Sequence, residues 1–218
     1  PSGGGKSTLA RLIARFWDVD SGTVLVNGRN VRDQPSRELL SSMSLVFQDV
    51  MLSTDTVRAN IALGNADATE TEIEEAARAA CIHDRIMQLP DGYDTIIGEG
   101  AHFSGGEAQR LTIARAFLAA SPILILDEAT AQADSHSERL IQQAISNLAQ
   151  KRTVIVIAHR LSTIQGVDQI AVIDAGRLVE LGTHDDLLTQ DGPYARLWRN
   201  QTNIAHALEG LRGKEQAC

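Results

Sequence analysis

A glycine-rich segment at the start of the chain has the residue types that bind phosphate. Residues 1–8 read Pro-Ser-Gly-Gly-Gly-Lys-Ser-Thr, which fits the pattern G-x-x-x-x-G-K-[ST] except for its first glycine. Glycines allow positive φ without a Cβ clash, so their amides can converge on phosphate oxygens, while Lys6 reaches the β- and γ-phosphates and Ser7 ligates Mg²⁺. We therefore expect a nucleoside triphosphate with Mg²⁺ to contact Ser2, Gly3, Gly4, Gly5, Lys6, Ser7 and Thr8.

Two adjacent carboxylates form the second chemical signal. Asp127 and Glu128 directly follow the apolar run 123–126, which is typical of a buried strand. With a phosphate loop upstream, we expect Asp127 to hold Mg²⁺, often through water, and Glu128 to polarise the attacking water. A general base of this kind contributes roughly 10²–10⁴-fold to a rate. For an isolated Asp-Glu pair, the alternative is a solvated strand end.

Gln48 and His159 each follow another apolar run, 45–47 and 154–158. An amide at a strand end can bind Mg²⁺ or water, and an imidazole there can hydrogen-bond a γ-phosphate. Taken alone, the first also fits a surface glutamine and the second a structural histidine. The other histidines have no metal-ligand spacing.

The sequence Ser104-Gly105-Gly106-Glu107 opens an Ala-rich helical pattern. The spacing S-x-x-E predicts a capping box with Ser104 as N-cap and Glu107 at position N3. Two glycines in a first helical turn cost about 1 kcal/mol each relative to alanine. A phosphate that approaches bare backbone at the helix N-terminus explains them, and both interpretations can hold together.

Composition limits the class of protein. The chain has 218 residues, 43% hydrophobic, enough for one domain or a domain with a subdomain. A net charge of −8 gives no basic footprint for nucleic acid. Cys81 and Cys218 are far apart, which fits a reducing cytosol without disulfides. No apolar run approaches the roughly 18–20 residues of a membrane helix, so a membrane connection must come from a partner or from other sequence.

The hydrophobic pattern predicts an α/β fold with a mostly parallel sheet and ligands at the carboxyl ends of its strands. Helical patterns cover about 54–120, strongest at 70–81 and 107–120. The tail after Gly192 is predicted to be one helix, with Tyr194, Leu197 and Trp198 in the core. The predicted strands are a hairpin over 23–31 that turns at Asn27-Gly28, then 44–47, 123–126, 154–157, 170–173 and 177–180.

These motifs, in this order, resemble the nucleotide-binding domain of ATP-binding cassette (ABC) transporters over essentially the whole chain. The resemblance implies a P-loop NTPase, or RecA-like, fold whose mostly parallel core carries a small antiparallel part and an inserted helical subdomain. It implies Walker A at 1–8, a Q-loop at Gln48, a signature at 103–107, Walker B at 123–127, catalytic Glu128, a D-loop at 131–134 and switch His159.

The resemblance also implies partners. Two such domains pair head-to-tail, as a homodimer or heterodimer, and sandwich two ATP molecules. Each site then takes Ser104, Gly105 and Gly106 from the opposite domain, and Asp134 lies beside the nucleotide. The implied organisation is a core of 1–50 and 121–192, a helical subdomain of about 51–120 and a C-terminal helix of about 193–212. ATP hydrolysis is then coupled to movement of a substrate by membrane domains, and no nucleic acid is involved.

Three segments resemble the exporter-type branch: Gly98-Glu-Gly100, His159-Arg-Leu-Ser-Thr163 and Gly182-Thr-His-Asp-Asp-Leu187. That branch implies membrane domains fused upstream, which place this domain at the cytoplasmic face of the inner membrane. Two motifs depart from the family pattern. The usual L-S-G-G-Q reads Phe103-Ser-Gly-Gly-Glu107, and S-A-L-D reads Ala131-Gln-Ala-Asp134. Together, these two variant motifs resemble those of exporter-type systems that handle siderophores.

Alternatives to a fused exporter-type module are a non-transport ABC ATPase and a detached importer-type subunit. A coiled-coil chromosome-maintenance ATPase is disfavoured, because no heptad run lies between Gln48 and Ser104. The first pattern glycine would precede Pro1. We therefore expect a longer protein whose upstream part supplies the strand that feeds the loop and an aromatic residue for adenine. Residues 1–218 alone are expected to be mostly monomeric and to bind ATP weakly.

Overall fold

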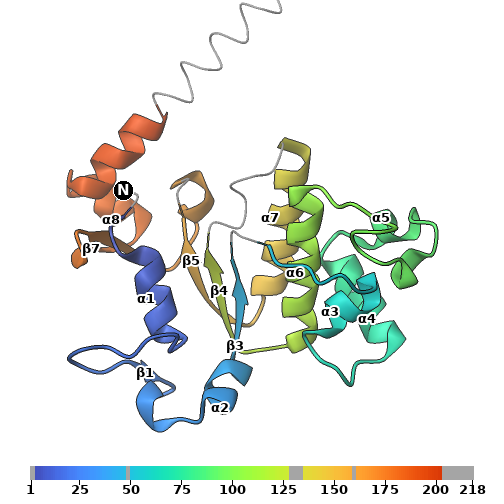
Figure 1. The fold of residues 1–218 in the computed structure, drawn as a ribbon. Coiled ribbons are helices and arrows are strands. Elements are labelled where there is room, and N and C mark those ends of the chain that lie inside the picture. The colour runs from blue at the N-terminus through green and yellow to red at the C-terminus, as the bar shows by residue number, and fades with distance from the viewer. Residues whose placement is uncertain (1–2, 48–49, 128–134, 159–160, 203–218) are drawn as a thin grey trace, which may run out of the picture. The chain divides into compact units, whose positions relative to one another are not determined.

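The computed structural model describes residues 3–47, 50–127, 135–158 and 161–202 (Figure 1). The chain divides into two compact units, one of residues 10–157 and one of residues 1–9 with 158–218. Each unit has its own hydrophobic core: the larger has two clusters of buried side chains and the smaller has one.

The larger unit is built on a parallel sheet in the order β3-β4-β5. Its strands are β3 (Met43–Val46), β4 (Ile123–Asp127) and β5 (Thr153–Ile157). Alternate side chains of β4 enter different cores: Leu124 and Leu126 belong to one cluster, whereas Ile125 belongs to the other. Because both faces are covered, the strands read as continuous apolar runs, as the sequence predicted.

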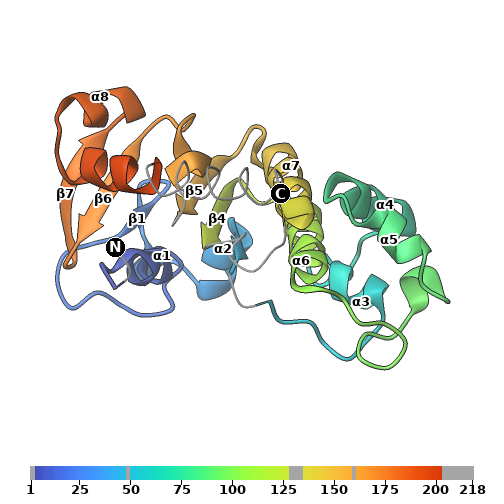
Figure 2. The same ribbon diagram turned by 90° about the horizontal axis from the view of Figure 1, so that it is seen from above.

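Helices cover the Leu124 face of this sheet. Figure 2 shows α6 and α7 beside the strands, with α3, α4 and α5 on the far side of α6. The bounds are α3 (Val57–Ala62), α4 (Glu70–Ala79), α5 (His83–Met87), α6 (Gly105–Ala119) and α7 (Ser135–Ala149), with a short 3-10 turn η2 (Gly92–Asp94). All of α3, α4 and α6 contribute to one continuous core with the sheet, so the helices are packed as part of this unit.

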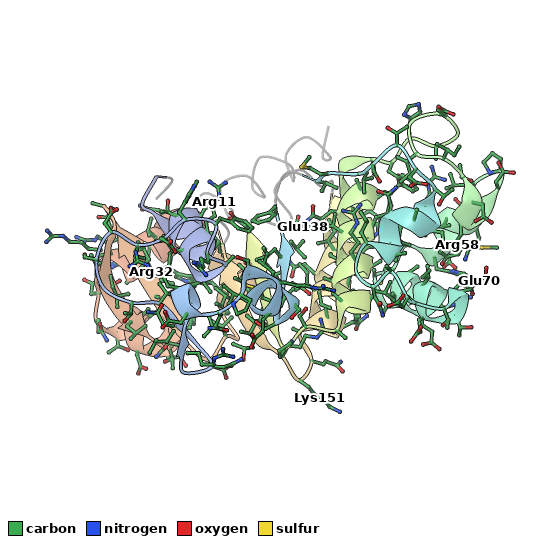
Figure 3. The ribbon with its side chains drawn as sticks, turned by 60° about the horizontal axis from the view of Figure 1, so that its bottom comes forward. Arg11, Arg32, Arg58, Glu70, Glu138 and Lys151 are labelled. Carbon is green, nitrogen blue, oxygen red and sulfur yellow. The ribbon has the colours of Figure 1, made fainter. Side chains whose placement is uncertain are left out.

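Ion pairs also connect the outer helices. Arg58 on α3 lies between two acidic residues, with its Nε 3.0 Å from Asp94 Oδ1 and its Nη1 3.4 Å from Glu70 Oε1 (Figure 3). The hydrogen bond from Arg58 holds the pKa of Asp94 below its ordinary value. These pairs are solvent-exposed, so their contribution to stability is expected to be small.

The opposite face of the sheet is covered by the end of α1, by α2 and by a hairpin. Their bounds are α1 (Lys6–Ile13), β1 (Leu25–Val26), β2 (Arg29–Asn30), the 3-10 turn η1 (Val31–Asp33) and α2 (Ser36–Ser41). Ala10, Val26 and Leu39 pack there with Ile125. The predicted hairpin is confirmed: β1 and β2 are antiparallel, and Asn27 and Gly28 have φ of 52° and 75°, as a type I′ turn requires.

The smaller unit contains an antiparallel pair of strands and the C-terminal helical segment. Its elements are η3 (Leu161–Ile164), β6 (Ile170–Asp174), β7 (Arg177–Gly182), α8 (His184–Thr189) and a helix over 193–202. Tyr194 is 1% exposed, and Leu197 and Trp198 pack against the same core, which confirms their predicted role. In the described part of the chain, no helix is long and apolar enough to cross a membrane.

Candidate nucleotide site

The glycine-rich loop has the backbone conformation that its sequence predicted. Gly3 and Gly5 have φ of 82° and 98°, values that other residues adopt only with strain. Helix α1 begins at Lys6, directly after the loop, and the Leu9 amide donates to the Gly5 carbonyl at 3.0 Å. The first turn of α1 therefore carries Lys6 and Ser7, both partly buried, at the end of the helix that favours anions.

A turn far along the chain supports this loop. Between β6 and β7, Ala175 and Gly176 have φ of 45° and 73°, and the Gly176 amide donates to the Gly4 carbonyl at 3.0 Å. A Cβ on Gly5 would lie 3.5 Å from the Gly176 Cα. The contact satisfies the carbonyl of the buried Gly4 and ties the loop to the turn between β6 and β7. The sequence predicted the strands 170–173 and 177–180 on either side of this turn, but not the contact of the turn with the loop.

In the larger unit, Asp127 lies at the carboxyl end of one of the three parallel strands. Asp127 is the last residue of β4 and pairs with Ile157, the last residue of β5, while β3 ends at Val46. All three strands run in the same direction, so their ends lie at one edge of the sheet. Asp127 itself is partly buried. The residues Ser2, Gln48, Glu128, Asp134 and His159 lie outside the described residues, so their roles stay predictions.

The start of α6 forms the predicted capping box. The Ser104 amide donates to Glu107 Oε2 at 2.8 Å, and the Glu107 amide donates to Ser104 Oγ at 3.3 Å. Helix α6 begins at Gly105, one residue after this N-cap. Ser104 is exposed whereas Gly106 is buried. The serine therefore accepts a hydrogen bond from an amide of the first turn and remains accessible to a ligand or a partner.

Helix α6 also contacts the segments on both sides of Gln48. Gln109 is 4% exposed, and its Nε2 donates to the carbonyl of Phe47 at 3.3 Å. Arg115 Nη1 donates to the carbonyl of Met51 at 2.9 Å. Sequence analysis missed both residues, and the only available signal was the presence of polar side chains within an apolar helix. The helix that Ser104 opens thus holds the backbone carbonyls of Phe47 and Met51.

Comparison with known proteins decides the family. Residues 1–131 match the family model described as ABC transporter. The chain belongs to the ABC transporter family. The match includes the glycine-rich loop, the Ser104 helix and Asp127, so the resemblance drawn from the motifs is confirmed.

Individual relatives are named as ATP-binding/permease proteins. The mycobactin import ATP-binding/permease protein IrtA of Mycobacterium tuberculosis is 52% identical over 97% of this chain and 25% of that protein. The putative multidrug export ATP-binding/permease protein YgaD of Bacillus subtilis is 50% identical over 92% of this chain and 35% of that protein. The chain thus spans about a quarter to a third of the relatives' length.

A solved structure confirms the fold. A bacterial Atm1-family ABC exporter with ATP bound superposes with a TM-score of 0.86 at 46% identity, over 92% of this chain and 35% of that one. The ABC chain therefore has the P-loop NTPase fold and corresponds to the ATP-binding domain of exporter-type transporters. Within the described residues, no three His, Cys, Asp or Glu side chains cluster as a metal site.

Proposed function

We propose that this domain binds ATP with Mg²⁺ and hydrolyses it, and that hydrolysis drives the movement of a substrate by membrane domains of a longer protein. The single observation that carries the proposal is the glycine loop, because its positive-φ glycines lead directly into α1 with Lys6 and Ser7 in the first turn. That arrangement is specific for the phosphates of a nucleotide.

Each predicted residue has a chemical role in this proposal. Lys6 neutralises the β- and γ-phosphates, while Ser7, Gln48 and Asp127 hold Mg²⁺ directly or through water. Glu128 polarises the attacking water and His159 hydrogen-bonds the γ-phosphate. When bound, Mg²⁺ would stabilise the negative charge that develops on the phosphates during transfer.

Hydrolysis is proposed to need two domains. The exposed Ser104 hydroxyl and the adjacent glycines face the nucleotide held by the loop of a second domain, in a head-to-tail dimer. Asp134 then lies near the same nucleotide. The membrane domains are proposed to lie upstream in the same polypeptide, which places this domain on the cytoplasmic face of the inner membrane.

Among cargo classes, a siderophore is the proposal that the comparisons favour. The relatives that match at 52–57% identity include mycobactin import proteins, and the chain has the variant signature residues Phe103 and Glu107. Multidrug export relatives match at 50–52%. Because the membrane domain selects the cargo, uptake of a labelled ferric siderophore into vesicles that contain the complete transporter tests this part separately.

The nucleotide proposal is tested by binding of a fluorescent ATP analogue to the complete protein with Mg²⁺. Lys6→Met is expected to weaken binding at least about tenfold, because a charge-assisted phosphate contact contributes roughly 1.5–3 kcal/mol. Lys151→Met is the matched control: Lys151 is an exposed lysine in the loop after α7 (Figure 3) and should leave binding unchanged. Equal binding by both variants would contradict a nucleotide site at the glycine loop.

A further inference from the structure

An arginine from a different helix contacts the start of α6. Arg85, on α5, donates from Nε to Glu107 Oε1 at 2.9 Å. Its guanidinium carbon lies 5.7 Å from the centre of the Phe103 ring, within the range of a cation–π contact. The side chains of Arg85 and Glu107 are 30% and 20% exposed. Arg85 therefore touches the residues on both sides of the Ser104-Gly105-Gly106 segment.

The Glu107 carboxylate joins Arg85 to the N-cap. Oε1 accepts from Arg85, while Oε2 accepts from the Ser104 amide at 2.8 Å. The orientation of the carboxylate is thus fixed from two sides, and it fixes Ser104 in turn. Because an arginine fork and a carboxylate are both planar, such a contact restricts orientation more than a lysine would.

The contact between Arg85 and Glu107 also changes the net charge at the start of α6. Glu107 lies in the first turn of α6, the end of the helix that attracts anions. The proposed function brings a triphosphate to the same turn, where a bare carboxylate would repel it. A glutamine at this position would make the same cap without a charge. With glutamate, a nearby cation is required to cancel the charge, and Arg85 supplies it.

We propose that Arg85 is a positioning residue for the nucleotide. It neutralises Glu107 and holds Phe103 and Ser104 in place, so that the start of α6 accepts the triphosphate of the opposing domain. The inference rests on the proposed function, and it names a residue outside the phosphate loop, the strand ends and the signature itself.

The test measures ATP hydrolysis by the complete transporter in nanodiscs, as a function of ATP concentration and at low and high salt. Arg85→Met removes the cation but keeps an unbranched apolar side chain. We expect the KM for ATP to rise roughly three- to tenfold at low salt, the size of a partly exposed ion-pair effect. The rise should shrink at high salt, because salt screens the repulsion from Glu107.

The decisive variant is the double substitution Arg85→Met with Glu107→Gln. It removes the carboxylate but keeps the capping geometry, so the KM should return toward the wild-type value. Arg78→Met is the matched control, since Arg78 forms an exposed pair with Glu74 on α4, at 3.5 Å. Its KM should equal that of the wild type. Melting temperatures of all variants report on folding.

Three outcomes separate the claims. A KM for Arg85→Met within twofold of the wild type would overturn the inference and leave the proposed function intact. A rise in KM that does not depend on salt and is not reversed by Glu107→Gln would show that Arg85 only stabilises the fold. That result would also overturn the inference. Absence of hydrolysis by the wild-type protein would contradict the proposed function and this inference with it.

Discussion

Arg115 on α6 binds both oxygens of Asn60 on α3. Its Nε donates to the Asn60 carbonyl at 2.6 Å and its Nη2 to Oδ1 at 2.8 Å. Asn60 is fully buried, and its Nδ2 donates to the carbonyls of Ser53 and Thr56 at 3.0 Å each. The pair therefore joins α3 and the segment after Gln48 to the helix that starts at Ser104, and burial lowers the pKa of Arg115.

This network predicts a large loss of stability for Asn60→Ala. The substitution leaves the amide of Ser53 and Nη2 of Arg115 without the oxygen that they share. Each hydrogen bond lost in this part-buried network costs about 0.5–3 kcal/mol, more where a charged group takes part, so we expect the free energy of unfolding to fall by roughly 2–4 kcal/mol. Urea unfolding measures it. Asn200→Ala, on an exposed helical position, is the control and should change stability by less than about 0.5 kcal/mol.

Ser104→Ala separates a helix cap from a nucleotide contact. Loss of the cap alone costs about 1 kcal/mol of stability and leaves hydrolysis roughly intact. The proposed function predicts instead that hydrolysis collapses in a protein that remains folded.

A mixed dimer then tests the head-to-tail arrangement of Ser104. If one copy carries Ser104→Ala, the impaired site should be the one whose Lys6 belongs to the other copy. A defect restricted to the site of the mutant copy's own Lys6 would refute this arrangement.

The buried hydroxyl of Tyr93 should make the stability of the protein depend on pH. Its hydroxyl lies 2.8 Å from His83 Nδ1 in a buried pair, and burial raises the pKa of Tyr93 from 10.0 to about 12. Because the folded-state pKa is the higher one, the neutral hydroxyl's contribution is fully present below pH 10 and is lost as the pH rises through 12.

Urea unfolding between pH 9 and about pH 11 checks this titration. The free energy of unfolding should fall with pH more steeply for the wild type than for Tyr93→Phe, by up to about 1.4 kcal/mol per pH unit. At neutral pH, Tyr93→Phe should be less stable by about 1–2 kcal/mol, because the buried His83 nitrogen loses its partner. Parallel curves for the two proteins would contradict the assignment to Tyr93.

Local signals predicted much of this fold. Asn27-Gly28 specified a hairpin, and Ser104 with Glu107 specified a capping box, because each pattern acts within a few residues of itself. The ends of the helices were predicted less accurately. The helical pattern over 70–81 stops at Ala79, since Cys81 has φ of 56°, and α6 stops at Ala119, since Ala120 has φ of 50°. A glycine usually marks such an end, and neither position has one.

The supports of the candidate site could not be predicted in the same way. The Gly176 amide, Gln109 and Arg115 each reach a partner that is distant in the sequence. No local periodicity records such contacts, because they depend on how the strands and helices pack. The limits of α7 were likewise not specified by the sequence analysis, although its position follows from the crossover between the parallel strands β4 and β5.

The central claim is that this domain hydrolyses ATP, and Glu128→Gln in the complete protein tests it most directly. Phosphate release with Mg-ATP is measured for the wild type and the variant, together with retained ATP after rapid gel filtration. The account predicts that the variant loses turnover by about 10²-fold or more, still binds ATP and accumulates as an ATP-bound dimer. Phosphate release by Glu128→Gln within twofold of the wild type would contradict it.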